Sequence, residues 1–239
     1  MLSWSYGVTT CTQRLTTLLP NTLESLAKSG FDSPRLFIDG CYESQTPDYL
    51  SDFEITCRYP AIGAYGNWIL SIWELYIRDP YAQRYAIFQD DLILCRGVKE
   101  YLEVCEYPVK GYLNLFTFLS NEHMIFKKPF GWHLSDQLGR GAIALVFDHL
   151  AVVTLLQQEN LVSKPQAPNG NQNIDGCIQE SLVARAGFKE YVHSPSLAQH
   201  TGITTTIGNN FNGKPHPQYI QGAKTFPGEK WNVFKELTK

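Results

Sequence analysis

Apolar residues in this chain fall into two alternating patterns, one typical of buried strands and one typical of helices. Short apolar runs alternate with stretches in which leucines and other apolar residues recur every three or four positions. This alternation predicts a parallel sheet with helices on its faces. The predicted strands lie near residues 5–10, 35–38, 84–88, 112–117, 142–147 and 195–198. The predicted helices lie near residues 15–29, 66–78, 97–106, 150–158 and 175–185.

Two adjacent carboxylates interrupt the most informative apolar stretch of the chain. Asp90 and Asp91 separate the run Tyr85–Phe88 from the run Leu92–Leu94. Burying an unpaired carboxylate is costly or makes the group take up a proton, so a buried pair needs a partner. A divalent ion such as Mg²⁺ or Mn²⁺ binds carboxylates together with substrate phosphates. A solvated turn, in which the carboxylates cap the next segment, is the alternative that this stretch leaves open.

Other polar residues lie where predicted strands end. Thr9, Thr10 and Arg14 follow the first strand, and Asp39 ends the second strand just before a glycine. Ligands of open α/β sheets bind beyond the carboxyl ends of the strands, and helix amides with an arginine suit a diphosphate. A helix cap with a surface arginine, and an ordinary Asp-Gly turn, remain the alternatives for these residues.

Four candidate residues occur further along the chain: Asn67, Gly141, Asp175 and His200. Asn67 follows a glycine-containing loop, where it could contact a ribose or a base, or cap a helix that starts at the next residue. Gly141 would let the backbone approach a sugar closely. Asp175 at a helix start is either a stabilised functional carboxylate or a simple cap. His200 follows an apolar strand, and neutral imidazole binds Mn²⁺ better than Mg²⁺, although a single histidine is more often structural.

In this order the segments resemble the GT-A family of nucleotide-sugar glycosyltransferases, and within it the inverting N-acetylglucosaminyltransferases of the N-glycan branching type. The resemblance runs from about residue 5 to about residue 208, and the order and spacing of the motifs carry it. It implies an α/β fold of the GT-A (Rossmann-like) type, with a mixed, mainly parallel sheet flanked by helices. It also implies a metal-dependent, inverting transfer of a sugar from a UDP-sugar, UDP-GlcNAc first, to an acceptor hydroxyl.

The resemblance further implies a role for each candidate residue. Asp91 and His200 would bind Mn²⁺ or Mg²⁺, Asp90 would lie near the ribose or a metal-bound water, and Asp175 would remove the acceptor proton. Asp39 would recognise the uracil ring. The implied nucleotide-sugar contacts are Thr9, Thr10, Arg14, Asp39, Asn67, Asp90 and Gly141. Where close relatives carry glutamate before the acidic pair, this chain has Gln89.

The composition narrows the functional classes. The chain has 239 residues, of which 44% are hydrophobic and only 18% charged, enough for one sizeable core without long disordered tracts. The net charge of -3, without a basic run, argues against a protein that neutralises nucleic-acid phosphates. The first residues are not those of a signal peptide, and no apolar run reaches the roughly 20 residues of a membrane span. We therefore expect a cytoplasmic protein.

The remaining expectations concern domain organisation and alternative functions. We expect one domain over residues 1–239, with a surface loop at 164–173 and a mobile C-terminal lid or tail from about 202 to 239. The six cysteines form no dense framework, which predicts free thiols and argues against a zinc site. A nucleotidyltransferase that makes a nucleotide sugar is one alternative, but the segment after the first strand lacks the glycine-rich loop of such enzymes. A catalytically silent sugar-binding protein is the other.

Overall fold

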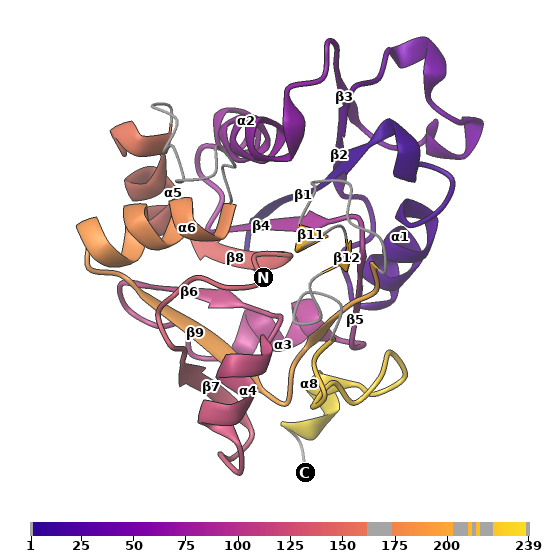
Figure 1. Ribbon diagram of the computed structural model, residues 1–239. Coiled ribbons are helices and arrows are strands. Elements are labelled where there is room, and N and C mark those ends of the chain that lie inside the picture. The colour runs from indigo at the N-terminus through magenta and orange to yellow at the C-terminus, as the bar shows by residue number, and fades with distance from the viewer. Residues whose placement is uncertain (1, 162–173, 203–209, 212–213, 216–221, 238–239) are drawn as a thin grey trace.

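The structure is a computed structural model that describes residues 2–161, 174–202, 210–211, 214–215 and 222–237. Its main strands are β1 (Trp4–Cys11), β2 (Arg35–Asp39), β3 (Ile55–Arg58), β4 (Arg84–Gln89), β6 (Gly111–Asn114), β7 (Gly131–Leu134), β8 (Ala144–Asp148) and β9 (Lys189–Ser194). These eight strands form one sheet in the order β3-β2-β1-β4-β8-β6-β9-β7 (Figure 1).

Two short strand pairs lie outside this sheet. β5 (Leu92–Leu94) pairs antiparallel with β10 (Ala198–His200), and β11 (Asn210–Phe211) pairs antiparallel with β12 (Lys214–Pro215). The first pair follows the acidic residues directly, so it determines which part of the distant chain lies beside them.

The main sheet is mixed and mainly parallel, as the sequence predicted. The strands β3, β2, β1 and β4 are parallel to one another, and β6 is parallel to β9. The pairs β4–β8, β6–β8 and β7–β9 are antiparallel. The carboxyl ends of β1, β2 and β4 therefore meet at one edge of the sheet, where ligands of open α/β folds bind.

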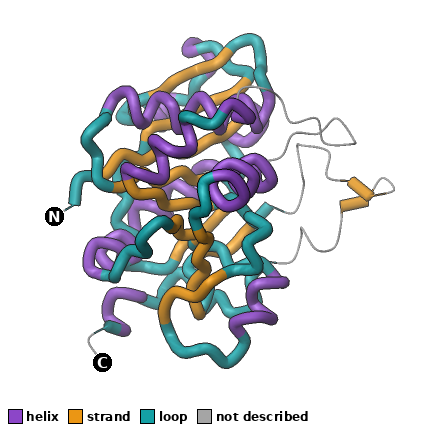
Figure 2. Tube along the Cα trace, turned by 90° about the vertical axis from the view of Figure 1, so that its left-hand side faces the viewer, coloured by secondary structure: helices purple, strands orange, loops and turns teal. Residues whose placement is uncertain are grey.

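Helices cover both faces of the sheet (Figures 1 and 2). The α-helices of the described residues are α1 (Leu19–Lys28), α2 (Gly63–Arg78), α3 (Val98–Val104), α4 (Leu119–Ile125), α5 (His149–Leu156), α6 (Ile174–Ile178) and α8 (Val233–Glu236). Short 3₁₀-helices span Thr12–Arg14, Glu43–Gln45, Asp48–Leu50 and Glu159–Leu161, and a π-helix at Gln179–Arg185 continues α6.

Two apolar cores lie on opposite faces of the sheet, and neighbouring residues of one strand contribute to different cores. In β4, Ala86 and Phe88 belong to the core that contains residues of α1 and α3, whereas Tyr85 and Ile87 belong to the core that contains residues of α2, α5 and α6. Side chains alternate between the faces of a strand, so a strand covered on both faces needs apolar residues throughout. This explains the continuous apolar run before the acidic pair.

Several predicted boundaries were wrong. The first helix begins at Leu19 rather than at residue 15, and Pro20, which lacks an N–H donor, lies in its first turn. The helix predicted from residue 66 begins at Gly63. Of the strand predicted at residues 195–198 only Ala198 lies in a strand, β10, and residues 195–197 lie between β9 and β10; Pro195 cannot donate to a strand ladder. The strands β3, β7 and β9 and the helix α4 were not predicted.

The predicted surface loop and most of the predicted lid lie outside the described residues. Residues 222–237 of the predicted lid and tail pack against the body of the molecule. Arg96 N donates to Trp231 O at 2.9 Å, Val233 N donates to Arg96 O at 3.0 Å, and the Val233 side chain is fully buried. The six cysteines are free thiols, as predicted.

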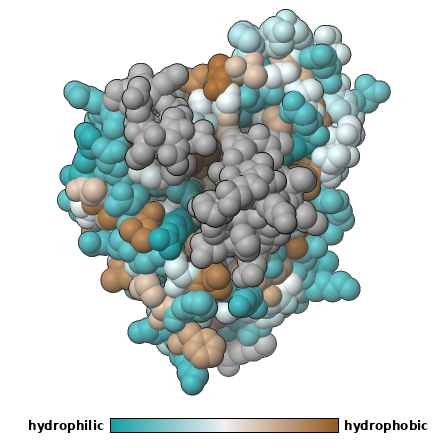
Figure 3. Space-filling view, in the orientation of Figure 1, coloured by the Kyte–Doolittle hydropathy of each residue, from teal (hydrophilic) through white to brown (hydrophobic). Residues whose placement is uncertain are grey.

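The described surface carries no single large apolar area on the face shown in Figure 3. Residues of this face are mainly hydrophilic, and hydrophobic atoms occur in small separate groups (Figure 3). None of the helices in the described ranges is long and apolar enough to cross a membrane.

Candidate functional site

The acidic pair lies at the end of β4, buried against the first strand and the turn that follows it. Thr10 Oγ1 donates to Asp90 Oδ2 at 2.5 Å. Arg14 Nη1 donates to Asp90 Oδ1 at 2.6 Å and to Asp91 Oδ2 at 2.9 Å. Asp90 is 2% exposed and Asp91 is 4% exposed, so the alternative of a solvated turn was wrong. The guanidinium of Arg14 supplies the cationic partner that a buried carboxylate pair requires.

His200 lies beside Asp91 because β10 pairs with β5. In this pairing His200 is opposite Leu92, and His200 Nε2 lies 3.3 Å from Asp91 Oδ2. Thr201 N donates to Asp91 O at 2.7 Å, which holds the end of β10 against the acidic pair. A Cβ atom at Gly202 would lie 2.9 Å from Asp91 Oδ2, so glycine allows this close approach of the two segments.

The two carboxylates differ in their electrostatic surroundings. Burial raises the pKa of Asp90, and the charge of Arg14 offsets this only in part. Burial acts in the same direction on Asp91, but the hydrogen bond and charge of His200, together with Arg14, outweigh it and lower the pKa of Asp91 below its usual value. Asp91 is therefore the carboxylate that stays ionised most readily, as a metal ligand must.

Asp91 and His200 fit a divalent cation. Asp91 Oδ1 and His200 Nδ1 are buried without hydrogen-bond partners. The 3.3 Å separation joins the other two atoms, His200 Nε2 and Asp91 Oδ2, so the atoms without partners are the ones left for an ion. Among the described residues no group of three or more His, Cys, Asp or Glu side chains could hold a metal ion. Two protein groups suit an ion whose other ligands are phosphate oxygens and water.

Asn67 lies inside α2 and joins two strands at their carboxyl ends. Its Nδ2 donates to Phe37 O at 3.0 Å and to Thr10 O at 3.3 Å, while its Oδ1 is buried without a partner. The alternative of a helix cap was wrong, because the helix starts four residues earlier at Gly63. Thr9 Oγ1 donates to Phe88 O at 3.3 Å and thereby ties β1 to β4.

Asp39 binds the N-terminus of α2. Its Oδ1 accepts from Ile62 N at 2.8 Å and its Oδ2 accepts from Gly63 N at 2.9 Å. A carboxylate at this position satisfies free amides of the first turn and interacts favourably with the helix dipole. The structure thus gives Asp39 a capping role, and its contact with a uracil ring stays a prediction.

Asp175, the second residue of α6, holds the backbone of the loop before β8. Its Oδ2 accepts from Gly141 N at 2.9 Å and its Oδ1 accepts from Ala142 N at 3.0 Å. Burial raises the pKa of this half-buried carboxyl group, and the two amides offset the effect only in part. Gly141 has a φ of +79°, and a Cβ there would lie 2.6 Å from the Phe116 ring, so only glycine suits the position.

Gln89 connects the acidic pair to the Asp175 loop. Its Nε2 donates to Ala142 O at 3.0 Å, and its backbone N donates to Ile143 O at 2.8 Å. The structure thereby places Asp90 and Asp175 on one connected edge of the molecule. The sequence analysis noted this residue only as a departure from glutamate. The amide of Gln89 can donate to a carbonyl oxygen, which an ionised glutamate cannot do. This difference was the signal in the sequence that residue 89 binds a backbone carbonyl.

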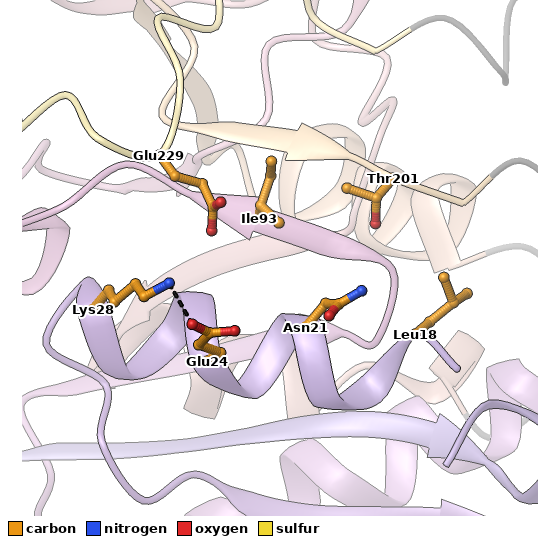
Figure 4. A pocket seen from close by; sticks show the side chains of 7 residues that line it. All are labelled: Leu18, Asn21, Glu24, Lys28, Ile93, Thr201 and Glu229. Carbon is orange, nitrogen blue, oxygen red and sulfur yellow. Dashed lines mark hydrogen bonds and ion pairs between the residues drawn. The ribbon is translucent and has the colours of Figure 1, made fainter. Parts of the chain in front are cut away.

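A separate groove of about 280 Å³ lies between α1 and the β5–β10 pair (Figure 4). Figure 4 shows Asn21, Glu24 and Lys28 of α1 on one side of the groove, with Lys28 directed to Glu24, and Glu229, Ile93 and Thr201 on the other side. Its lining is Leu18, Asn21, Glu24, Lys28, Ile93, Thr201 and Glu229. None of these is a predicted site residue, so the cavity and the candidate chemistry do not coincide.

No protein-family profile and no curated protein sequence matches this chain. Solved structures match it in fold. GalNAc-T7, solved with UDP, GalNAc and Mn²⁺, matches with a TM-score of 0.61 and 12% identity, over 94% of this chain and 47% of that chain. This chain therefore spans about half the length of that protein. The match confirms a GT-A-like fold and does not confirm the N-glycan branching type.

Two nucleotidyltransferases match less closely. An inositol-1-phosphate CTP transferase from T. maritima has a TM-score of 0.44 and 11% identity, over 80% of this chain and 85% of that chain. A nucleotidyl transferase from Methanothermobacter thermautotroptrophicus has a TM-score of 0.49 and 12% identity, over 80% of this chain and 88% of that chain.

Proposed function

We propose that this protein is a metal-dependent, inverting glycosyltransferase that moves a sugar from a UDP-sugar to an acceptor hydroxyl. The observation that carries the proposal is the buried Asp90–Asp91 pair at the carboxyl end of β4, joined to Arg14 and His200. The GT-A-like fold supports it, since GalNAc-T7 has the same fold and was solved with UDP, GalNAc and Mn²⁺.

Transfer from a UDP-sugar releases a diphosphate, whose negative charge must be stabilised. In this proposal Asp91 and His200 hold Mn²⁺ or Mg²⁺, which supplies Lewis-acid stabilisation of the leaving diphosphate. Asp90, which also accepts from Thr10 Oγ1, holds Arg14 at the end of β1, where a guanidinium can also neutralise phosphate oxygens. Asn67, whose buried Oδ1 has no hydrogen-bond partner among the described residues, is the proposed contact to the ribose or base.

Asp175 is the proposed general base. As the acceptor oxygen attacks the anomeric carbon and the bond to the diphosphate breaks, the Asp175 carboxylate takes the hydroxyl proton. Each of its oxygens accepts one amide and retains further acceptor capacity. Its raised pKa makes it a better proton acceptor than an ordinary aspartate. Direct displacement by one base-activated hydroxyl inverts the anomeric centre.

The first sugar donors to test are UDP-GlcNAc and UDP-GalNAc. UDP-GlcNAc follows from the resemblance seen in the sequence, and UDP-GalNAc follows from the sugar that was solved with GalNAc-T7. The proposed acceptor is a saccharide or another hydroxyl compound, because Asp175 removes a proton from a hydroxyl group in this mechanism.

The test measures the turnover of a set of UDP-sugars with and without Mn²⁺. The quantity measured is the UDP that is released. Metal-dependent transfer or slow hydrolysis supports the proposal. Formation of a nucleoside triphosphate from the nucleotide sugar and added pyrophosphate would instead show a nucleotidyltransferase. Binding without any turnover would show a silent sugar-binding protein.

The base assignment is tested separately with Asp175→Asn. The variant should keep its affinity for UDP but lose at least about 10²-fold in transfer rate, the lower end of typical general-base contributions. Asp148→Asn, at the N-cap of α5, is the matched control for a helix-terminal carboxylate. Parental turnover in Asp175→Asn, or a product with the donor's anomeric configuration, would contradict the assignment.

A further inference from the structure

A second carboxyl group, which no substrate can reach, lies beneath the loop that holds Asp175. Glu190 in β9 is fully buried. Its Oε2 accepts from Ser135 Oγ at 2.5 Å and its Oε1 accepts from Asn114 Nδ2 at 3.1 Å. Both oxygens therefore have partners, and any effect of Glu190 on chemistry must act through those partners.

The loop of residues 135–142 is attached to Glu190 at both of its ends. At the first end, Ser135 N and Gln137 Nε2 donate to Glu190 O at 3.1 and 2.8 Å, and Glu190 N donates to Gln137 Oε1 at 3.1 Å. At the other end, the Asn114 amide that binds Glu190 also donates to Arg140 O at 3.1 Å. Arg140 directly precedes Gly141, whose N–H binds Asp175.

We propose that Glu190 is a positioning residue that fixes the loop of residues 135–142 through Ser135 and Asn114, and thereby orients the Asp175 carboxylate. The inference rests on the proposed function in one respect only, the role of Asp175 as the base. The attachment of the loop itself rests on the hydrogen bonds above. A displacement of about 1 Å in a reacting group can lower a rate by about 10²-fold, so such an anchor affects turnover without touching the substrate.

The charge state of Glu190 provides a specific signature for this role. The polar and charged groups that face it are Tyr112 and Asn114 from β6, Ser135 and Asp136 from the loop, and Asp175 from α6. Burial raises the pKa of Glu190 to about 7; the hydrogen bonds from Ser135 and Asn114 act in the opposite direction, and the negative charges of Asp175 and Asp136 add to the effect of burial. The nearby cation is Arg140, whose Nη1 lies 3.7 Å from Asp136 Oδ2.

The sign of the resulting pH dependence follows from linkage. The unfolded chain releases the glutamate proton near pH 4.3, whereas the folded protein retains it up to about pH 7. The contribution of protonated Glu190 to stability is therefore present below the unfolded pKa and is lost as the pH rises through about 7. The loop should loosen over the same range, because an ionised Glu190 repels Asp136 and Asp175.

The experiment compares the full chain with Glu190→Gln, which cannot ionise and keeps nearly the same shape. Hydrogen exchange of residues 135–142, corrected for the intrinsic effect of pH, is measured at pH 6 and pH 8. In the parent protein protection of this loop should fall between the two pH values, and in Glu190→Gln it should not. Equal pH dependence in both proteins overturns the proposal, whatever the activity of the protein.

Turnover then distinguishes a positioning role from a structural one. Glu190→Ala should lower kcat for the UDP-sugar by about tenfold or more with little change in KM, and Glu190→Gln should restore kcat and remove the decline above about pH 7. The control for destabilisation elsewhere is Glu74→Gln in α2, which removes the carboxylate that Thr56 and Arg58 of β3 bind. A parallel change of kcat in Glu190→Ala and the control would refute the positioning role.

The two proposals fail in different ways. A parent protein without any transfer or hydrolysis contradicts the proposed function, while the exchange measurement still decides the attachment of the loop to Glu190. Normal transfer in the parent together with unchanged loop exchange and kcat in Glu190→Ala contradicts only the positioning role.

Discussion

Single residues at the site differ in what their polar atoms can still bind. Asp91 Oδ1 has no hydrogen-bond partner although it is buried, whereas Arg14 and His200 hold the other oxygen of the same carboxylate. Asp39 and Asp175 each use both oxygens on backbone amides. Asp91 therefore carries the strongest argument for a metal ion.

We predict that Asp91→Asn abolishes Mn²⁺-dependent binding of UDP and leaves the protein folded. The amide keeps the size of the side chain but removes the negative oxygen on which the ion depends. Calorimetric titration with UDP, with and without Mn²⁺, measures the effect. Asp32→Asn, at an exposed aspartate, is the matched control. Parental affinities in Asp91→Asn would exclude Asp91 as a ligand.

A second prediction at this scale concerns Gln89→Glu. The substitution replaces the donor to Ala142 O by a carboxylate oxygen and brings a charge beside Asp90. It should lower the free energy of unfolding by about 1–3 kcal/mol, the usual effect of leaving a buried polar group without its partner. Urea unfolding provides the measurement. Gln83→Glu should be nearly neutral, because Gln83 Oε1 accepts from Ser3 N and a glutamate can do the same.

Among the secondary-structure elements, α2 and the β5–β10 pair position the site. The N-terminus of α2 is attached to the end of β2 through Asp39, and its Asn67 binds the ends of β1 and β2. The β5–β10 pair brings His200 to the end of β4. The candidate site is thus built from elements that are distant in sequence.

The prediction at this scale is that Asp39→Asn weakens both the fold and the binding of UDP. Loss of the charge and of one amide contact at the start of α2 should cost about 1 kcal/mol of stability. Asp148→Asn, at the N-cap of α5, should cost a similar amount and leave UDP affinity unchanged. Thermal unfolding and UDP titration of both variants test this. Equal UDP affinity in the two variants would limit Asp39 to a helix cap.

Considered as a whole, the molecule joins two cores through one sheet and presents its candidate chemistry along one edge of that sheet. A ligand that binds this edge contacts elements from both halves of the sequence, so it should stabilise the folded state as a unit. The match to GalNAc-T7 covers 94% of this chain and leaves about half of that protein unmatched.

We therefore predict that UDP and Mn²⁺ together raise the melting temperature and that neither does so to the same extent alone. A ligand at a hundred times its dissociation constant, bound only to the folded state, stabilises by about 2.7 kcal/mol. A thermal-shift series with UDP, Mn²⁺, both, and both with EDTA provides the measurement. A shift with UDP that EDTA leaves unchanged would contradict metal dependence.

The sequence by itself determined the elements whose pattern is local. The apolar runs of β1, β2, β4 and β8 and the helical spacing of α2 and α5 were predicted, since strand and helix periods are visible within one segment. The position of Asp90 and Asp91 between two apolar strands also predicted that these carboxylates need a partner. The alternation of the elements predicted a parallel sheet, and the family resemblance implied the mixed, mainly parallel sheet that the structure has.

Only the tertiary structure decided which distant residues meet. His200 reaches Asp91 through a strand pair of three residues. Asp175 binds a loop more than thirty positions before it, and Glu190 binds Ser135, which lies 55 positions before it. These contacts depend on strand order and on packing between elements. The spacing of apolar residues within one segment carries no information on either. The ionisation of a carboxyl group likewise depends on its burial and neighbouring charges, which exist only once the chain has folded.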